Sequence, residues 1–390
     1  MEKTKVRTLI RQVRGVSYKP EDLHNELDDN SVILLRANNI DEGKINFDDV
    51  VYVDKSKVSD EQYLKDGDIL ICASSGSKNL VGKAASIRLN MECTFGAFCK
   101  VVRPKEGIEE YLGVYFQSPI YRRKISEVAI GANINNIRNE HIDELDIPVF
   151  SNDEQVSIAK RMHLIQEVIS NRKAELEKLD DLIKARFVEL FGDAIHNDKG
   201  WENDTVEKLC KEIYGGGTPS KSHPEYYEDG DIPWVSSKDM KTDVLTDSQI
   251  KINQLGVDNS TARMVPINSV IMVIRSGILK HTLPVAINAV PITVNQDLKI
   301  FIPNERVLTR FLAIQFKMHE KDILSGVRAV TADNIEFNSL KQRELIVPPI
   351  ELQQEYVTFL EQIDKSKVVV QKALDETQIL FNSLMQQYFG

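Results

Sequence analysis

The same short motifs occur twice in this sequence, about 200 residues apart. Residues 144–148 (ELDIP) return as ELIVP at residues 344–348, and Ser-Gly at residues 75–76 returns at residues 276–277. The spacing between the copies changes by only a residue or two, as single insertions in surface loops would produce. Solenoid repeats have periods of about 20 to 50 residues, so this much longer period predicts a duplicated domain.

Length and composition are those of a globular protein with more than one core. The chain has 390 residues, 42% of them hydrophobic, and no apolar run approaches the roughly 20 residues of a membrane span. Residues 1–19 carry several Lys and Arg side chains without the apolar stretch of a signal peptide, and the four cysteines form no CxxC pair. We therefore expect a cytoplasmic protein with no membrane association and no metal site.

The distribution of charge favours a nucleic-acid partner although the total charge does not. The net charge of −10 opposes binding to phosphates. Residues 259–296 contain no Asp or Glu, whereas 59 acids in 390 residues predict about six, and residues 69–91 are also free of acids. Buried strands account for part of each window, but not for the basic residues in the loops that follow. We interpret these loops as electropositive surfaces at equivalent places in the two copies.

Residues 1–150 and 193–349 each show the pattern of an α+β module, in which short β-rich runs alternate with turns and one amphipathic helix. The helices are expected at residues 111–117 and 311–317. The strands are expected at residues 32–35, 50–53, 68–72, 95–102, 232–235, 269–274, 284–290 and 298–302.

A long segment of different character follows each module, at residues 151–192 and 350–390. Apolar residues recur at every third and fourth position in both, in the same register, and neither Pro nor Gly interrupts residues 152–191 or 352–389. Each segment therefore predicts one helix of nearly forty residues. The heptad positions are Ile158, Met162, Ile165, Ile169, Arg172, Leu176, Leu179, Ile183, Arg186 and Leu190, and then Tyr356, Leu360, Ile363, Lys367, Val370, Leu374, Thr377, Phe381, Leu384 and Tyr388.

Polar residues interrupt this apolar stripe at different places in the two helices. Arg172 and Arg186 interrupt the first, and Lys367 and Thr377 interrupt the second. Two such helices prefer each other to self-pairing, so we predict an intramolecular antiparallel coiled coil. The alternative is that each helix packs independently on its own module.

The sequence contains no recognisable catalytic motif. Residues 76–84 (GSKNLVGKA) are similar to a phosphate-binding loop, but five residues instead of four separate the glycines, and Ala84 replaces the Ser or Thr that would hold magnesium. Neither a G-x-S-x-G nor an H-E-x-x-H motif is present. We expect a chain that is not an enzyme and has no cofactor of its own.

The two modules instead carry side chains suited to reading base edges. Arg and Lys suit guanine, Asn suits adenine, and Ser and Thr suit either. The DNA-binding candidates of the first module are Arg36, Asn38, Asn39, Ser74, Ser75, Ser77, Lys78, Asn79 and Lys83. Those of the second module are Ser220, Lys221, Ser236, Ser237, Lys238, Arg275, Ser276, Lys280, His281 and Thr282. The hypothesis depends on their matched positions in the two copies, because each residue alone is typical of a solvated loop.

Several motifs in this order resemble the specificity subunit of type I restriction-modification enzymes. They are residues 216–220 (GGTPS) followed by residues 232–235 (IPWV), residues 67–70 (GDIL), and the Leu-x-Ile/Val-Pro sequences at residues 145–148 and 345–348. Both long segments also end in Phe-Gly. Individually the motifs are weak, but their order and repetition make the resemblance specific, and it covers the whole chain.

The resemblance implies an α+β fold with two tandem, pseudo-repeated α/β target-recognition domains, separated by two long antiparallel coiled-coil helices. It implies a non-catalytic subunit that reads a bipartite, gapped double-stranded DNA target, one half-site per domain. Such a subunit assembles two modification subunits, joined by restriction subunits in systems that cleave. S-adenosylmethionine and ATP are implied only for those partner subunits.

Two other classes of function remain open at this point. One is the specificity subunit of a related type II enzyme that cuts beside its site. The other is a two-module scaffold that binds proteins. Salt-dependent DNA binding distinguishes the scaffold from both DNA-reading subunits.

Overall fold

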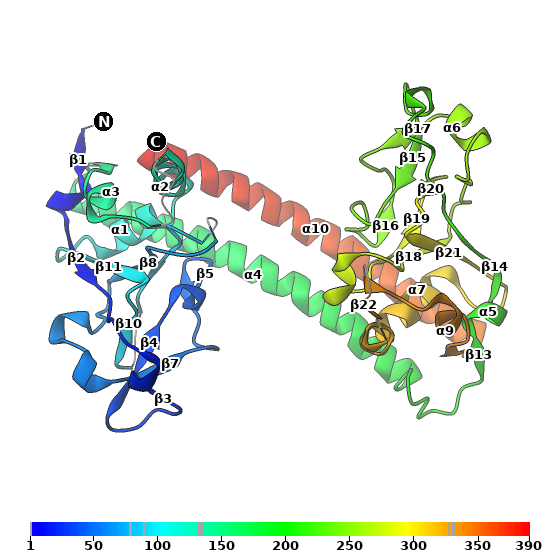
Figure 1. Cartoon of the computed structure of the whole chain (residues 1–390), viewed down its shortest axis with the longest axis horizontal. Helices are drawn as coiled ribbons and strands as arrows, with labels where there is room; N and C mark the ends of the chain where they lie inside the picture. Colours follow the sequence, from blue (N-terminus) through cyan, green and yellow to red (C-terminus); the bar gives the residue numbers. More distant parts are fainter. Residues whose placement is uncertain (1, 78–79, 89–90, 132–135, 327, 330–332) are drawn as a thin grey trace. The chain divides into compact units, whose positions relative to one another are not determined.

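The computed structural model describes residues 2–77, 80–88, 91–131, 136–326, 328–329 and 333–390 (Figure 1). The chain divides into two units: unit 1 is Met1–Ala174 with Val370–Gly390, and unit 2 is Glu175–Val369. The two long helices, α4 (Asn152–Phe191) and α10 (Ile350–Phe389), contribute residues to both units. Each unit is therefore one module together with parts of both helices.

The same antiparallel sheet forms the centre of each module. Its strand order is β2-β11-β8-β9 in unit 1 and β14-β21-β18-β19 in unit 2, where β16 extends it. The central strands β8 and β18 (ILIC and VIMV) are buried at every residue, which explains why they show no alternation of polar and apolar positions. The bounds are β2 Ile10–Arg14, β11 Cys99–Pro104, β8 Ile69–Cys72, β9 Ala84–Ser86, β14 Cys210–Gly215, β21 Leu298–Pro303, β18 Val270–Val273, β19 Val285–Asn288 and β16 Val244–Leu245.

A second, smaller sheet in each module contains a parallel pair of strands. In unit 1 β4 (Ser31–Leu35) pairs with β10 (Cys93–Phe95), and in unit 2 β15 (Ile232–Val235) pairs with β20 (Thr293–Val294). Because the paired strands are parallel, the loops that follow them leave the sheet at the same edge. The remaining strands of these sheets are β7 (Val51–Asp54) and β3 (Leu23–His24) in unit 1 and β17 (Lys251–Ile252) in unit 2.

A short strand pair closes each module where its long helix begins. β1 (Lys3–Lys5) pairs with β12 (Asp146–Pro148), and β13 (Asn203–Thr205) pairs with β24 (Glu344–Ile346). The other helices are α1 (Glu109–Phe116), α2 (Pro119–Gly131) and α3 (Asn139–Asp143) in unit 1, and α5 (Val206–Leu209), α6 (Gln254–Asp258), α7 (Thr309–Met318), α8 (Glu320–Ser325) and α9 (Phe337–Lys341) in unit 2. Two hairpins, β5 (Ile40–Asp41) with β6 (Lys44–Ile45) and β22 (Arg328–Ala329) with β23 (Asp333–Asn334), complete the strands. None of the described helices is long and apolar enough to cross a membrane.

Most of the elements predicted from sequence are confirmed to within one or two residues, α4 and β15 to the residue. One prediction is wrong. Residues 95–102 are not a single strand, because β10 ends at Phe95 and β11 begins at Cys99. The Cys99 amide donates to the Gly96 carbonyl oxygen at 2.9 Å and closes a tight turn that contains Phe98.

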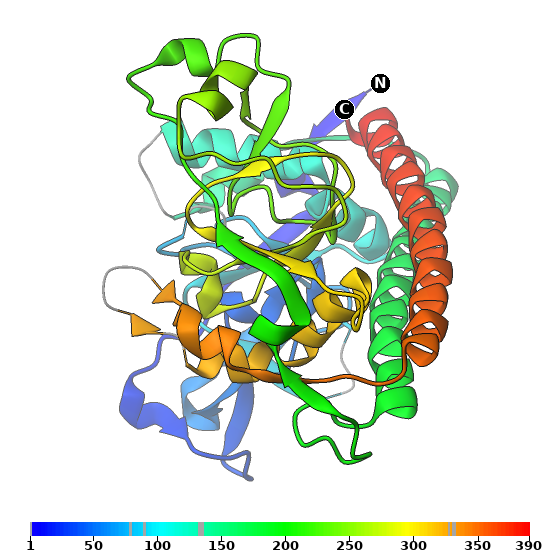
Figure 2. The same cartoon turned by 90° about the vertical axis from the view of Figure 1, so that its right-hand side faces the viewer.

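The two long helices pair in antiparallel orientation within each unit, as predicted (Figure 2). In unit 2 the Tyr356 hydroxyl donates to the Ile183 carbonyl oxygen at 3.0 Å, and further along α10 the Lys367 ammonium pairs with Asp180. In unit 1 the Arg161 guanidinium donates to the Tyr388 hydroxyl at 3.3 Å. The alternative of independently packed helices is therefore wrong.

The predicted heptad positions all face inward, since every one of them is buried or partly buried. Two of the four polar interruptions form ion pairs across the helix pair, whereas the Thr377 hydroxyl donates to the Ala373 carbonyl oxygen of its own helix. Arg186 donates to Glu355 at 2.7 Å, and Lys367 pairs with Asp180. Exposed ion pairs of this kind contribute little stability, but they favour one register of two helices over others.

The long helix α4 begins in unit 1 and ends against the module of unit 2, and α10 begins in unit 2 and ends against the module of unit 1. The Phe389 ring of α10 lies 5.3 Å from the Tyr111 ring and 5.6 Å from the Tyr115 ring, both on α1 of unit 1. The Phe191 ring of α4 lies 4.9 Å from the Phe311 ring on α7 of unit 2. Both phenylalanines are 1% exposed or less, so each module completes its core with the end of a helix that began at the other module.

This packing predicts that the two aromatic anchors act on separate units. Phe389→Ala should destabilise unit 1 and Phe191→Ala unit 2, each by about 3 to 5 kcal/mol, because a buried aromatic ring is lost. Hydrogen exchange of the full chain measures this. Phe389→Ala should raise exchange in α1 and leave α7 unchanged, and Phe191→Ala should do the reverse. Leu380→Ala, at a half-exposed position of α10, is the control. Equal loosening of α1 and α7 in both variants would contradict the prediction.

Candidate nucleic-acid interface

Three loops meet at one edge of the smaller sheet in unit 1. The parallel pairing of β4 with β10 brings the first two together, and there the Gly96 amide donates to the Leu35 carbonyl oxygen at 2.9 Å. The loop after β8 joins them, because the amides of Ala73 and Ser74 donate to the Phe98 carbonyl oxygen at 2.9 and 3.0 Å. Segments distant in sequence thus form one surface.

These loops surround a cavity of about 300 Å³, which we call the reading cavity of unit 1. Its polar and aromatic lining consists of Tyr18, Arg36, Asn38, Ser74, Ser75 and Phe98. Four of these are predicted site residues, whereas Tyr18 and Phe98 are not. The Phe98 side chain is 71% exposed, which is unusual for an aromatic ring among hydrogen-bonding groups. Such a ring can contact a thymine methyl group or stack on a base.

Asp49 holds the polar side chains of this cavity in place. Its carboxylate accepts from the Arg36 guanidinium at 3.0 Å and from the Asn38 amide at 2.7 Å. A guanidinium fixed by a carboxylate on one side keeps its other N–H groups for a ligand. Figure 1 places the β4 strand that carries this loop next to β10 and β7.

The prediction for Asn39 needs correction. Its side chain is 1% exposed, accepts from the Arg36 amide at 2.7 Å and donates to the backbone carbonyl oxygens of Asn46 and Asp49 at 2.9 Å each. Every hydrogen-bonding group of this amide is used within the loop, so Asn39 shapes the turn and is not available to a base.

Unit 2 repeats the backbone geometry of these loops. The Asn295 amide donates to the Val235 carbonyl oxygen at 2.9 Å, as Gly96 does to Leu35. The Ile274 amide donates to the Asp297 carbonyl oxygen at 2.9 Å, at the position where Ala73 and Phe98 are bonded in unit 1. The turn after β15 is also the same, because the Ser236 amide donates to the Asp239 carboxylate at 2.8 Å.

The side chains on this shared backbone differ. Asp297 replaces the exposed aromatic ring of Phe98, and it accepts from Nε of Arg275 at 2.7 Å. Arg275 lines a cavity of about 390 Å³, the reading cavity of unit 2, together with Gln296, Lys299 and Asn334. Burial and the nearby Arg275 lower the pKa of the Lys299 ammonium. Unit 2 therefore also presents a guanidinium fixed by a carboxylate.

The remaining candidates of unit 2 lie on loops near this cavity. Ser276 begins the short 3-10 helix at Gly277–Lys280, and the Lys280 ammonium lies 3.8 Å from the Asp333 carboxylate. The Thr218 hydroxyl bonds to Gln296 and ties the Gly-Thr-Pro loop, which contains Ser220 and Lys221, to the cavity wall. The Ser236 hydroxyl donates to Asp239 at 2.8 Å. Exposed side chains in these loops are those of Ser220, Lys221, Lys238, Lys280, His281 and Thr282.

Among the described candidates of unit 1, Ser77 and Lys83 do not line its reading cavity, and neither does Asn39. Lys78 and Asn79 lie outside the described residues, and Ser77 is exposed beside them. Lys83 lines a different cavity, next to the paired helices. Among the described residues, no three His, Cys, Asp or Glu side chains converge on a position that could hold a metal ion. The surfaces described here can donate and accept hydrogen bonds.

Comparison with known proteins gives a consistent result for both modules. Residues 19–179 and 198–377 match the family model of the type I restriction modification DNA specificity domain. The specificity subunit of the type I restriction enzyme StySPI from Salmonella potsdam is 28% identical over 98% of this chain and 86% of that subunit. The EcoKI specificity subunit of Escherichia coli K12 is 38% identical over 51% of this chain and 43% of its own length.

Two solved structures share the fold along the whole chain. The S subunit of a type I restriction-modification system from M. genitalium is 15% identical, with a TM-score of 0.59 over 100% of this chain and 96% of that one. A chain from a study of complex assembly and conformational transition in a type I R-M system is 14% identical, with a TM-score of 0.56 over 100% of this chain and 97% of that one.

Proposed function

Because the chain belongs to the type I restriction-modification DNA specificity family, we propose that each of its two modules reads one half of a bipartite, gapped double-stranded DNA target. The chain is a type I specificity subunit with two tandem recognition domains. One observation supports the assignment of one half-site to each module. The loops around the two reading cavities, which we call the reading loops, share their main-chain hydrogen bonds. They carry different side chains, Phe98 in unit 1 and Asp297 in unit 2.

The two fixed arginines are the groups best suited to read a base in each module. A guanidinium binds O6 and N7 of guanine through two N–H groups, and a carboxylate behind it sets the direction of those groups. Asp49 does this for Arg36, and Asp297 does it for Arg275. Phe98 adds an apolar contact in unit 1 that unit 2 lacks, so the two half-sites should differ in sequence.

The chain contributes recognition and assembly, and the partner subunits contribute the chemistry. This is supported by the lack of a catalytic motif in the sequence and by reading cavities lined with hydrogen-bonding side chains. S-adenosylmethionine and ATP would then be bound by modification and restriction subunits. The relatives reported above are named for type I enzymes, which favours this function over a type II enzyme or a protein-binding scaffold.

The proposed function is tested by mapping methylated adenines across the genome of cells with and without this chain. We expect a gapped motif that is methylated only when the chain is present. If no motif depends on the chain, or if the motif is continuous, the proposal of two half-sites fails.

The fixed arginines predict a separable effect on the two half-sites. Arg36→Ala should cost about 1 to 3 kcal/mol of binding free energy and relax the half-site read by unit 1, because one bidentate contact is lost. Arg275→Ala should relax only the other half-site. Methylation mapping and titration of the assembled complex with DNA measure both effects. Arg11→Ala, an exposed arginine of unit 1 paired with Glu61, is the matched control. Relaxation of both half-sites by one substitution would count against one module per half-site.

We infer that the helix pair carries the docking surface for two modification subunits. Contiguous exposed apolar side chains mark binding surfaces. Leu182 in unit 2 and Leu380 in unit 1 occupy equivalent heptad positions and are 45% and 50% exposed. Further exposed apolar residues are Val156, Leu164, Val168 and Ile379 in unit 1, and Val188, Val368 and Val369 in unit 2. A surface present once in each unit accounts for two subunits per chain.

This surface predicts stepwise loss of partners. Leu182→Glu or Leu380→Glu should leave complexes with one modification subunit, and the double variant should bind none, because a buried charge opposes docking. Native mass spectrometry of the assembled complex counts the subunits. Lys184→Glu and Gln371→Glu, at exposed polar positions of the same helices, should retain two. Two subunits on the double variant would place the docking surface elsewhere.

A further inference from the structure

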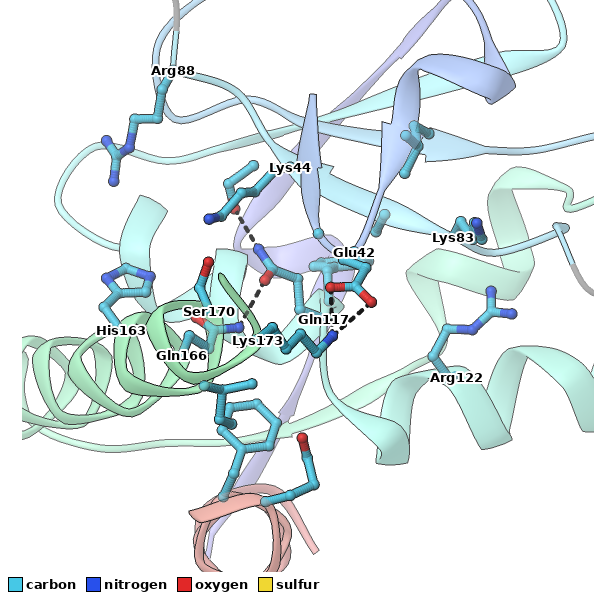
Figure 3. Close-up of a pocket in the computed structure, with 18 residues that line it drawn as sticks. Glu42, Lys44, Lys83, Arg88, Gln117, Arg122, His163, Gln166, Ser170 and Lys173 are labelled. Atoms are coloured by element: carbon cyan, nitrogen blue, oxygen red, sulfur yellow. Dashed lines mark hydrogen bonds and ion pairs between the residues drawn. The ribbon is translucent and has the colours of Figure 1, made fainter. Parts of the chain in front are cut away.

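Unit 1 contains a second cavity, of about 550 Å³, between the helix pair and the module (Figure 3). We call it the basic cavity. Its charged lining is unusual for a chain with a net charge of −10. The cationic side chains are Lys44, Lys83, Arg88, Arg122 and Lys173, and Glu42 is the single carboxylate among the lining residues. Burial and Arg88 lower the pKa of His163, which also lines the cavity, so His163 adds no positive charge at neutral pH.

The walls of the basic cavity are fixed by hydrogen bonds. The Gln166 amide of α4 donates to Gln117 at 3.0 Å, and the Gln117 amide donates to Ser86 of β9 at 3.1 Å (Figure 3). The Lys173 ammonium lies 2.7 Å from the Glu42 carboxylate and anchors the tip of the β5-β6 hairpin to α4. The cavity is therefore formed before any ligand binds.

The hairpin tip requires glycine at this place. Gly43 has φ +81°, and a Cβ atom there would lie 2.5 Å from Oε1 of Gln117. The close approach keeps the hairpin against the cavity wall and directs the following residue, Lys44, to the cavity.

Two of the cations have no partner among the residues that the structure describes. Arg122 donates to the Val81 carbonyl oxygen at 2.7 Å, and Arg88 pairs with Glu110. The ammonium groups of Lys44 and Lys83 form no hydrogen bond or ion pair within the described part of the chain. They are available to a ligand that carries negative charge.

We propose that the basic cavity binds backbone phosphates of DNA beside the half-site that unit 1 reads. This inference rests on the proposed function. The two cavities of unit 1 share their wall segments. The stretch from Arg36 to Lys44 contributes Arg36 and Asn38 to the reading cavity and Lys44 to the basic cavity. The loop after β8 contributes Ser74 and Ser75 to the reading cavity, and Lys83, directly before β9, lines the basic cavity. On this proposal, DNA whose bases meet the first cavity has its backbone near the second.

The aromatic lining favours a phosphate backbone over a free nucleotide. Phe116 and Phe381 line the basic cavity but are 0% and 8% exposed, so neither offers a face on which a free base could stack. Phosphate contacts position a protein on DNA without reading sequence, and in an acidic chain they must come from locally gathered cations.

The described part of unit 2 differs at positions equivalent to the wall of the basic cavity. The positions of Gln117 and Gln166 are occupied there by Lys317 and Asp364, at offsets of 200 and 198 residues. Lys317 pairs with Asp243, and Asp364 pairs with Arg310, so both side chains are already used in ion pairs. The backbone contact should therefore be a property of the first half-site alone.

The test uses the assembled complex and measures DNA affinity at several salt concentrations. Lys44→Ala and Lys83→Ala should each lower the slope of log affinity against log salt by about one, and should weaken binding about fivefold at 0.15 M salt. The loss should be equal for cognate and unrelated DNA, and the methylated motif should not change. Lys83→Arg should keep the slope. Lys372→Ala, an exposed lysine of α10 in the same unit, is the control for loss of charge.

Four results would overturn the inference. An unchanged salt slope in the double variant, which combines Lys44→Ala with Lys83→Ala, means that no phosphate is bound in the basic cavity. A relaxed first half-site means that the cavity reads bases, and loss of a modification subunit means that it binds a partner segment. Binding of ATP or inorganic pyrophosphate by the wild-type complex, abolished in the double variant without change in DNA affinity, means that the ligand is a free phosphate compound. If the wild-type complex shows no preference for a gapped motif, the proposed function itself has failed.

Discussion

The packing of each long helix against both modules is the interaction on which the rest of the structure depends. Each module has a sheet of its own, but its core is complete only when aromatic residues from the ends of α4 or α10 fill it. Phe191 does this for unit 2 and Phe389 for unit 1, in contact with Phe311 and Tyr111 respectively. The reading loops carry polar groups and an exposed ring, which add little stability, so the sheets and helices must hold them in place.

Duplication of one backbone explains how a single chain can read two different sequences. The hydrogen bonds at Leu35 and Val235 place the loops of the two modules alike, and those bonds involve main-chain atoms only. Substitution of exposed side chains at positions such as 98 therefore leaves these main-chain bonds intact. Where unit 1 presents Phe98, unit 2 presents Asp297, which in turn fixes Arg275. Recognition can change at such positions without a cost to the fold.

Sequence patterns predict those elements whose structure depends on interactions between residues close in sequence. The helix α4 was predicted to the residue because its heptads continue without Pro or Gly until Gly192, which has φ +76° and ends the helix. The sequence predicts one strand over residues 95–102 because the turn within them contains no strong signal beyond Gly96. Two apolar strands on either side of a tight turn have the same composition as one longer strand. Only the tertiary pairing of β10 with β4 shows that β10 and β11 are different strands.

Some of the candidate residues predicted from sequence lie together in the structure, and others do not. Arg36, Asn38, Ser74 and Ser75, which the sequence indicates by their matched loop positions, line one cavity. Lys83 follows the same loop but faces the other cavity, since β9 begins directly after it. Residues such as Gln296, Lys299 and Asn334 were missed because they carry no motif, and only the folded sheet brings them to Arg275.

Hydrogen exchange of the assembled complex on three DNA duplexes tests the central claim most directly. One duplex carries the full gapped motif, and in each of the others one half-site is scrambled. The account predicts that residues 36–39 and 74–77 are protected only when the first half-site is intact, and residues 236–238 and 275–282 only when the second is intact. Protection of both sets of loops by a single half-site, or of neither set by the full motif, would contradict it.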